Sequence, residues 1–366
     1  PESSAASDVY KRQAITLRRF MSPYIEELKV TAQAMVAKGK GILAMDESNG
    51  TCNKRFDKLG IPTTEEYRQA YRQLILTTPD LSNYISGPIL YDETIRQSTK
   101  EGVPFLKVIT DAGMIPGIKV DTGAKNLAGH PNEKVTEGLD GLRERIAEYY
   151  QMGARFAKWR AVITIGDGIP SRACIEANAH GLARYAALCQ EGGLVPIVEP
   201  EVLIDGNHTL EHCFQVTDET LHTVFNHLYT QGVALDQMVL KPSMVIPGKD
   251  CPTQVSVEAV AEATINCLLK NVPVTVAGIA FLSGGQSIEQ SSAHLNAMNA
   301  LFGSRCPWPV TFSYARAIQQ PALDYWSGDS ARVAEAQQKL LARAKCNSAA
   351  SVGEYLASMD ETPVLV

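Results

Sequence analysis

The sequence has no pair of cysteines spaced as CxxC, although it contains eight cysteines in 366 residues. A disulfide scaffold is a weak interpretation of such scattered positions, and free, mostly buried thiols in a reducing compartment are the better one. No apolar run approaches ~18 residues, which argues against a membrane-spanning helix. Residues 1–4 also lack the apolar segment of a signal peptide. These absences predict a soluble protein, cytoplasmic or in the plastid stroma if a transit peptide has been removed.

Basic residues are too few to make the surface a general binder of polyanions. Lysine and arginine number 34 against 40 aspartates and glutamates, which gives a formal net charge of −6. Nucleic acid is therefore a poor first expectation for a partner. A local basic pocket that binds a phosphorylated small molecule remains compatible with this charge.

No low-complexity linker divides the chain, and eight short apolar segments alternate with stretches of helical length. At roughly 150 residues per domain the length allows two domains, but α/β barrels commonly exceed that size as one unit. Most of the segments are apolar on nearly every position, as strands covered on both faces are. This alternation favours one α/β domain, a (β/α)₈ TIM barrel, over a doubly wound sheet. Neither GxGxxG after a strand nor GxxxxGK[ST] occurs. The expected strands are 41–45, 84–90, 117–120, 156–163, 194–199, 238–244, 274–282 and 310–314.

Capping signals place several of the helices. Thr63 and Glu66 have the spacing of a capping box for a helix over 65–76. Pro170 just inside the start, with Gly192 and Gly193 just past the end, predicts another helix. Further amphipathic helices are expected over 138–152, 217–230 and 256–269.

Charged and polar residues gather at the carboxyl ends of the expected strands, where a barrel carries its active site. An unpaired buried charge costs several kcal/mol, so a collection of them at these ends needs a reason. The residues are Asp46, Lys119, Lys158, Arg160, Glu199, Glu201, Lys241, Ser283 and Arg316.

Lys241 follows an apolar segment and is the candidate nucleophile. A lone lysine in this position is more often a surface residue that extends its amine into water, but here other charged strand ends accompany it. A free lysine amine, with a pKa of about 10.4, is protonated at neutral pH and does not attack a carbonyl. Burial and a neighbouring cation such as Lys158 would favour the neutral, nucleophilic form.

The other charged strand ends have two interpretations each. Lys158 and Arg160 lie on one side of a strand by its two-residue period. With Glu199 and Glu201 they form either an active-site shell or a structural layer of ion pairs. Asp46 and Glu199 are candidates for general acid and base, which requires that their environments differ. Ion pairing with a lysine is the alternative, and both roles are compatible.

Two loops predict a phosphate site. Ser283, Gly284 and Gly285 lie between the seventh strand and a helix, where backbone amides and a helix N-terminus favour an anion. A Gly-Gly turn alone is more often only a tight loop. Tyr314, Ala315 and Arg316 end the eighth strand, and loops after strands seven and eight of barrels commonly bind phosphate. Arg316 would hold the phosphate with two parallel hydrogen bonds.

The histidines predict no metal site. His208 and His212 have helical spacing, but their sequence is not HExxH and no third ligand is evident. We therefore expect neither a metal nor another cofactor.

Seven motifs, in order across nearly the whole chain, resemble those of the class I fructose-1,6-bisphosphate aldolases. The resemblance implies a (β/α)₈ barrel without metal or cofactor, usually a homotetramer. It also implies reversible cleavage of the sugar bisphosphate to dihydroxyacetone phosphate and glyceraldehyde 3-phosphate through a lysine Schiff base, in glycolysis, gluconeogenesis or the Calvin cycle. The motifs are GILAMDES (41–48), GIKVD (117–121), AKWR (157–160), PIVEPE (196–201), LKP (240–242), FLSGGQ (281–286) and FSYAR (312–316).

The resemblance also implies residue roles. Lys241 matches the Schiff-base lysine, and Glu199 matches the acid and base of carbinolamine formation and dehydration. Lys158 matches the lysine beside the imine, and Asp46 the aspartate near the C4 hydroxyl. Glu201 and Arg160 complete the polar shell. The residues that match the site of the C1 phosphate are Ser283, Gly284, Ala315 and Arg316. Those that match the surroundings of the other phosphate are Ser48, Thr51 and Lys119.

Three departures from the family accompany these matches. Ala315 stands where animal members often have glycine, and Thr51 replaces a serine but keeps the hydroxyl. The last tyrosine is Tyr355, whereas many members have a terminal tyrosine that assists proton exchange at C3.

The organisation expected is one barrel domain over residues 1–366, with a helical extension over about 1–40 and a tail over about 345–366. Two alternatives to the leading function stay open at this point. One is a preference for sedoheptulose 1,7-bisphosphate or use of both ketoses, and the other is a non-catalytic scaffold on the same barrel.

Overall fold

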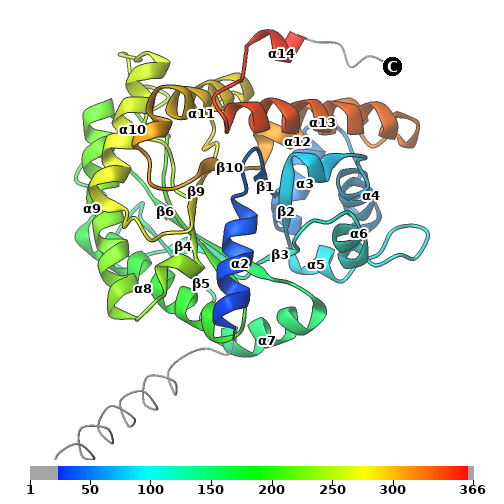
Figure 1. The fold of residues 1–366 in the computed structure, drawn as a ribbon, viewed down its shortest axis with the longest axis horizontal. Helices are drawn as coiled ribbons and strands as arrows, with labels where there is room; N and C mark the ends of the chain where they lie inside the picture. The colour runs from blue at the N-terminus through cyan, green and yellow to red at the C-terminus, as the bar shows by residue number, and fades with distance from the viewer. Residues whose placement is uncertain (1–23, 362–366) are drawn as a thin grey trace, which may run out of the picture.

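The computed structural model describes residues 24–361. Its centre is a closed barrel of parallel strands in the order β1-β10-β9-β8-β7-β6-β3-β2, surrounded by helices (Figure 1). The predicted (β/α)₈ barrel is confirmed. The strands are β1 (Gly41–Ala44), β2 (Ile85–Leu90), β3 (Gly117–Lys119), β6 (Phe156–Ile163), β7 (Val195–Val202), β8 (Val239–Leu240), β9 (Gly278–Phe281) and β10 (Val310–Tyr314).

Helices follow the strands and cover the outside of the barrel. Across residues 24–361, every helix is too short or too polar to span a bilayer. The α-helices are α2 (Ile25–Met35), α3 (Asn49–Asp57), α4 (Glu65–Leu76), α5 (Asp92–Ile95), α6 (Phe105–Asp111), α7 (Leu142–Met152), α8 (Arg172–Glu191), α9 (Leu210–Thr230), α10 (Val257–Asn271), α11 (Ile288–Phe302), α12 (Arg316–Trp326), α13 (Val333–Ala350) and α14 (Ser358–Glu361). Short 3₁₀ helices are η1 (Leu81–Asn83), η2 (Leu235–Gln237), η3 (Gly303–Arg305) and η4 (Ser330–Arg332).

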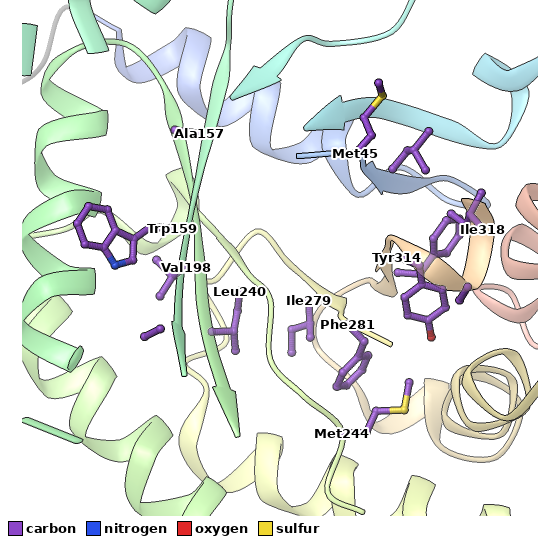
Figure 2. Packing of buried hydrophobic residues seen from close by; sticks show 14 of the residues in the cluster. Met45, Ala157, Trp159, Val198, Leu240, Met244, Ile279, Phe281, Tyr314 and Ile318 are labelled. Carbon is purple, nitrogen blue, oxygen red and sulfur yellow. The ribbon is translucent and has the colours of Figure 1, made fainter. Parts of the chain in front are cut away.

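The outward and inward faces of the barrel strands carry different kinds of side chain. Trp159 of β6 points out of the barrel and stacks on Tyr185 of α8, with ring centroids 5.5 Å apart. Figure 2 shows Trp159 with other residues of this outer layer between strands and helices. By the two-residue period, Phe156, Lys158 and Arg160 of the same strand face the barrel interior. Apolar inward residues near the strand starts therefore give way to charged ones near the strand ends.

The helix α2 closes the amino-terminal end of the barrel. Its Leu28 and Met35 are fully buried and belong to one cluster with the inward-facing Phe156. The hydroxyl of Ser86, near the start of β2, donates a 2.7 Å hydrogen bond to the carbonyl of Met35. Because this end is filled, the carboxyl end is where a ligand has access.

Several predicted boundaries are wrong at the strand ends. β7 continues through Glu199 and Glu201 to Val202, because those carboxylates face the barrel mouth in a regular strand. The strand predicted over 238–244 is regular only at Val239–Leu240. An antiparallel hairpin of β4 (Gly123–Asn126) and β5 (Lys134–Glu137) was not predicted, since its residues are mostly exposed and carry no apolar pattern.

The helix starts also differ from the sequence signals. α4 spans 65–76 as predicted, but its cap is Thr64, whose side chain accepts a hydrogen bond from the amide of Tyr67, and not Thr63. Pro170 precedes the cap of α8, Ser171, and so lies outside the helix. The tail expected from about residue 345 begins inside α13, where Cys346 and Ala350 are buried. The expected extensions over residues 1–23 and 362–366 lie outside the described residues.

Gly87 of β2 lies where no side chain fits. A Cβ atom added there would lie 2.1 Å from the carbonyl oxygen of Ile115. We expect Gly87→Ala to lower the free energy of unfolding by about 3 kcal/mol, because backbone must move to accept it. Gly181 is the control: nothing lies within 4 Å of its added Cβ, so Gly181→Ala in α8 should stabilise by up to about 1 kcal/mol. Urea unfolding measures both, and a Gly87→Ala loss below about 0.5 kcal/mol would contradict the clash.

Candidate active site

A cavity of about 520 Å³ opens at the carboxyl ends of the barrel strands. It brings together residues from nearly every strand of the barrel, although they are up to 270 positions apart in the chain. Of the site residues predicted from the sequence, it contains Asp46, Ser48, Thr51, Lys119, Lys158, Arg160, Glu199, Glu201, Lys241, Ser283, Gly284, Ala315 and Arg316.

Four buried charges form a continuous chain in the floor of this cavity. The amine of Lys158 lies 3.0 Å from Asp46 Oδ2 and 3.1 Å from Glu199 Oε2. The other carboxylate oxygen of Glu199, Oε1, lies 3.2 Å from the amine of Lys241. All four side chains are at least nine-tenths buried by residue exposure. Glu199 therefore joins the two lysines, one at each oxygen.

The contacts of Glu199 are Coulombic rather than aligned hydrogen bonds. Lys158 donates a hydrogen bond to Asp46, but Glu199 Oε2 receives none from the residues that the structure describes, despite the 3.1 Å distance. A buried carboxylate oxygen that accepts no hydrogen bond lowers the stability of the fold, and its presence calls for a functional explanation. Glu199 Oε2 is therefore the carboxylate oxygen in this group of charges that remains available to a bound molecule.

Electrostatic interactions determine the protonation states of Asp46 and Lys158 within this row of charges. Burial disfavours the ionised form of Asp46, but Lys158, Lys241 and Lys119 outweigh it and lower its pKa to about 2. Burial likewise disfavours the cation of Lys158, but Asp46 and Glu199 outweigh it and raise the pKa of that amine. At neutral pH Asp46 is therefore a carboxylate and Lys158, which lies between Asp46 and Glu199, is an ammonium.

Two further ion pairs line the rim of the cavity. Arg160 pairs with Glu201 through its Nε atom. The amine of Lys119 lies 2.6 Å from Asp121 Oδ1 and donates to the carbonyl of Asp121. Burial opposes the charge of Arg160, but Glu201 outweighs it and raises the pKa of the guanidinium. The layer of ion pairs considered from the sequence is thus present within the cavity itself.

The loops after β9 and β10 present backbone amides and a cation to the same cavity. Gly284 has φ +55°, a left-handed conformation that favours glycine and turns the loop after Ser283 toward α11. α12 begins at Arg316, directly after Ala315. A helix start with free amides and an adjacent arginine is a favourable place for an anion.

A buried arginine ties these two loops together from behind. Arg343 of α13 donates to the carbonyl of Ile288, the first residue of α11, at 2.9 Å. It also donates to the carbonyl of Ala317 in the first turn of α12, at 3.3 Å, and pairs with Asp360. One side chain therefore links the first turns of α11 and α12.

The loop after β1 is held in a similar way. Arg72 and Arg55 pair with the two carboxylate oxygens of Glu47, at 2.9 and 2.5 Å. Ser48 caps α3 by accepting a hydrogen bond from the amide of Thr51, and the two hydroxyls lie 3.1 Å apart. These contacts orient the segment that carries Asp46.

Comparison with known proteins decides which family this geometry represents. Residues 27–364 match the family described as fructose-bisphosphate aldolase class-I. A probable fructose-bisphosphate aldolase class 1 of Xanthomonas campestris is 62% identical over 332 residues, which cover 90% of this chain and 99% of that protein. The chain belongs to the class I fructose-bisphosphate aldolases.

Other members of the family agree in sequence and in structure. The chloroplastic fructose-bisphosphate aldolase 3 of Arabidopsis thaliana is 48% identical over 355 residues, 97% of this chain and 89% of that one. A solved Plasmodium falciparum aldolase, in complex with TRAP and a small-molecule inhibitor, has a TM-score of 0.90 and 47% identity. It covers 92% of this chain and 98% of its own. This chain is thus an aldehyde-lyase that cleaves fructose 1,6-bisphosphate reversibly.

Two predicted site residues of this aldolase do not line the cavity. Tyr314 points outward from β10 into the hydrophobic core, where its hydroxyl donates to the carbonyl of Ser291 at 2.9 Å. Gly285 is also absent from the cavity lining, and a Cβ added to it would lie 3.0 Å from the amine of Lys249.

The sequence analysis missed several residues that line the cavity. Asp121, which fixes Lys119, lies inside the quoted GIKVD motif and was overlooked as a site residue. Tyr91 follows β2, and the sequence signal for it was its place directly after an apolar segment. Glu47 neighbours Asp46, and the start of β4 around Gly123 lay in a stretch without strand pattern.

The histidines considered from the sequence lie apart from this site. Within residues 24–361, no three histidine, cysteine or acidic side chains are grouped as metal ligands. His208 is buried, and its burial lowers its pKa. All eight cysteines are free thiols, and seven of them are buried.

Proposed function

We propose that Lys241 is the residue that forms the Schiff base with C2 of the ketose. The observation that carries the proposal is the placement of Glu199, whose two oxygens lie 3.2 Å from Lys241 and 3.1 Å from Lys158. The amine of Lys241 makes no aligned hydrogen bond to any described residue, so its lone pair is available once a proton is lost.

The proton transfers follow from the same chain of charges. Glu199 takes up the proton that the Lys241 ammonium loses, and the neutral amine then attacks C2 to give a carbinolamine. Glu199 returns a proton to the carbinolamine hydroxyl, which leaves as water, and the protonated imine forms. The protonated imine then withdraws electrons from the C3–C4 bond. Asp46, ionised because its pKa is about 2, accepts the C4 hydroxyl proton while the bond breaks. Glyceraldehyde 3-phosphate leaves first and an enamine remains on Lys241. The enamine takes up a proton at C3, and hydrolysis of the imine so formed releases dihydroxyacetone phosphate and the free lysine amine.

The two phosphates have separate places in this proposal. The C1 phosphate binds to Ser283, Gly284, Ala315 and Arg316, where helix starts and a cation meet. The second phosphate binds near Ser48, Thr51 and Lys119, on the opposite side of the cavity floor. Arg160 and Glu201 form the polar wall between them.

Trapping the imine tests this assignment. We expect borohydride reduction in the presence of dihydroxyacetone phosphate to add a stable adduct to one peptide, the one that contains Lys241. Mass spectrometry after proteolysis locates the adduct, and samples without borohydride or without ligand serve as controls. An adduct on Lys158 or Lys119 instead of Lys241 would refute the assignment.

The remaining proposals concern organisation. We propose one barrel domain with its extensions, acting as a homotetramer, in the cytoplasm or the plastid stroma. Exposed apolar side chains on the outer helices, among them Tyr229 at 85% exposure and Leu301 at 54%, support burial against further copies. Sedimentation velocity distinguishes a tetramer from a monomer.

A further inference from the structure

Tyr91 occupies a place in the barrel that the proposed reaction does not use. Strand pairing aligns Ala44 with Ile89, and Ile89 with Gly117. Side chains two residues apart on a strand point to the same face. Asp46, Tyr91 and Lys119 each lie two residues after one of these aligned residues, so they share the next inward-facing level. Tyr91 therefore stands in one row between two residues of the proposed site.

The hydroxyl of Tyr91 has no hydrogen-bond partner among the residues that the structure describes. Its side chain lines the cavity, and it makes no hydrogen bond to any of residues 24–361. Burial, with the nearby charges of Asp92, Glu93 and Asp121, raises the pKa of the phenol. It is consequently protonated at neutral pH and can donate a hydrogen bond to an anion.

The other hydrogen-bond donors at this edge of the cavity already have partners within the protein. The amine of Lys119 already contacts both a carboxylate oxygen and the carbonyl of Asp121. The hydroxyls of Ser48 and Thr51 lie 3.1 Å from one another, within hydrogen-bond distance. A phosphate at this edge of the cavity thus meets one neutralised cation and two hydroxyls that are paired before it arrives.

We propose that Tyr91 donates a hydrogen bond to the second phosphate, the one on the half of the sugar that leaves as the aldehyde. Tyr91 is a specificity-determining residue in this role, because it contacts the phosphate of the aldehyde half and not the phosphate of the reacting ketone half. The inference rests on the proposed function, in which that phosphate lies near Lys119.

A pair of substrates isolates this contact. We expect Tyr91→Phe to raise KM for fructose 1,6-bisphosphate about tenfold with kcat changed less than about twofold, as loss of one hydrogen bond to a charged group predicts. With fructose 1-phosphate, which lacks the second phosphate, KM and kcat should both stay within about twofold of wild type. Tyr84→Phe, at the amino end of the same strand, is the matched control and should leave both substrates unaffected.

The reverse reaction gives a second, independent readout. With dihydroxyacetone phosphate held constant, Tyr91→Phe should raise KM for glyceraldehyde 3-phosphate by the same factor and leave that for unphosphorylated glyceraldehyde unchanged. The variant keeps the aromatic ring, and circular dichroism checks its fold.

Each alternative result has a distinct meaning. Equal losses on both sugars would overturn the inference by placing Tyr91 at the reacting half, and unchanged kinetics on both would overturn it by removing any contact. Both results leave the Schiff-base proposal intact. If the wild-type protein gave no Lys241 adduct, the proposed function itself would fail, independently of the Tyr91 kinetics.

Discussion

Lys241→Met is expected to lower kcat for cleavage of fructose 1,6-bisphosphate by at least about 10⁴-fold. Methionine has nearly the length of lysine but no amine, so the imine that accepts electrons from the C3–C4 bond does not form. General acid and base groups alone do not replace it, because cleavage would then produce a free carbanion. Borohydride should add no adduct to the variant in the presence of dihydroxyacetone phosphate.

The fold of this variant is expected to persist. Glu199 keeps its contact with Lys158 at 3.1 Å, so no buried carboxylate is left without a cation. Lys270→Met is the matched control, since Lys270 is an exposed residue paired with Asp218 on the outer helices. It should retain activity within about twofold. Turnover by Lys241→Met within tenfold of wild type would contradict the assignment of the nucleophile.

The strand bodies and the charged strand ends were predictable because each follows from short-range sequence pattern. Lys158 and Arg160 alternate with the outward Ala157 and Trp159, and this period alone placed both cations on one side of the strand. The same period, applied to β10, would have turned Tyr314 outward into the core. Its position beside Arg316 in the chain was the misleading signal.

Other features depend on contacts that no local pattern contains. Glu47 is fixed by Arg72, 25 positions away, and the first turns of α11 and α12 are joined by Arg343 of α13. The end of β7 was placed too early, because two glutamates in a strand resemble a loop until the charged cavity around them is known. Tertiary pairing, rather than propensity, determines these elements.

Lys158→Met is expected to have the second large effect, on both activity and stability. Lys158 is the shared cation of Asp46 and Glu199, and its removal leaves two buried carboxylates close together with one lysine, Lys241. We expect kcat to fall by about 10³-fold, because a fixed charge that stabilises the proton transfers is lost. We also expect the free energy of unfolding at neutral pH to fall by about 3–5 kcal/mol. Lys107→Met, which breaks an exposed pair with Asp111, should cost less than about 1 kcal/mol.

The pH dependence of unfolding distinguishes loss of this ion pair from loss of packing. In the wild-type protein the pKa of Asp46 is lowered from 3.8 to about 2, so this carboxylate stabilises the fold above pH 3.8 and stops doing so as the pH falls through 2. Without Lys158, fewer cations oppose the effect of burial, which raises the pKa of Asp46. Asp46 therefore takes up its proton at a higher pH in the variant than in the wild type. The stability difference between wild type and Lys158→Met should therefore narrow as the pH falls from about 5 toward about 2. Urea titrations across this window measure it. A stability difference that stayed constant across this pH range would assign the loss to packing around the aliphatic part of Lys158. The ion pairs of Lys158 with Asp46 and Glu199 would then contribute little to the stability of the fold.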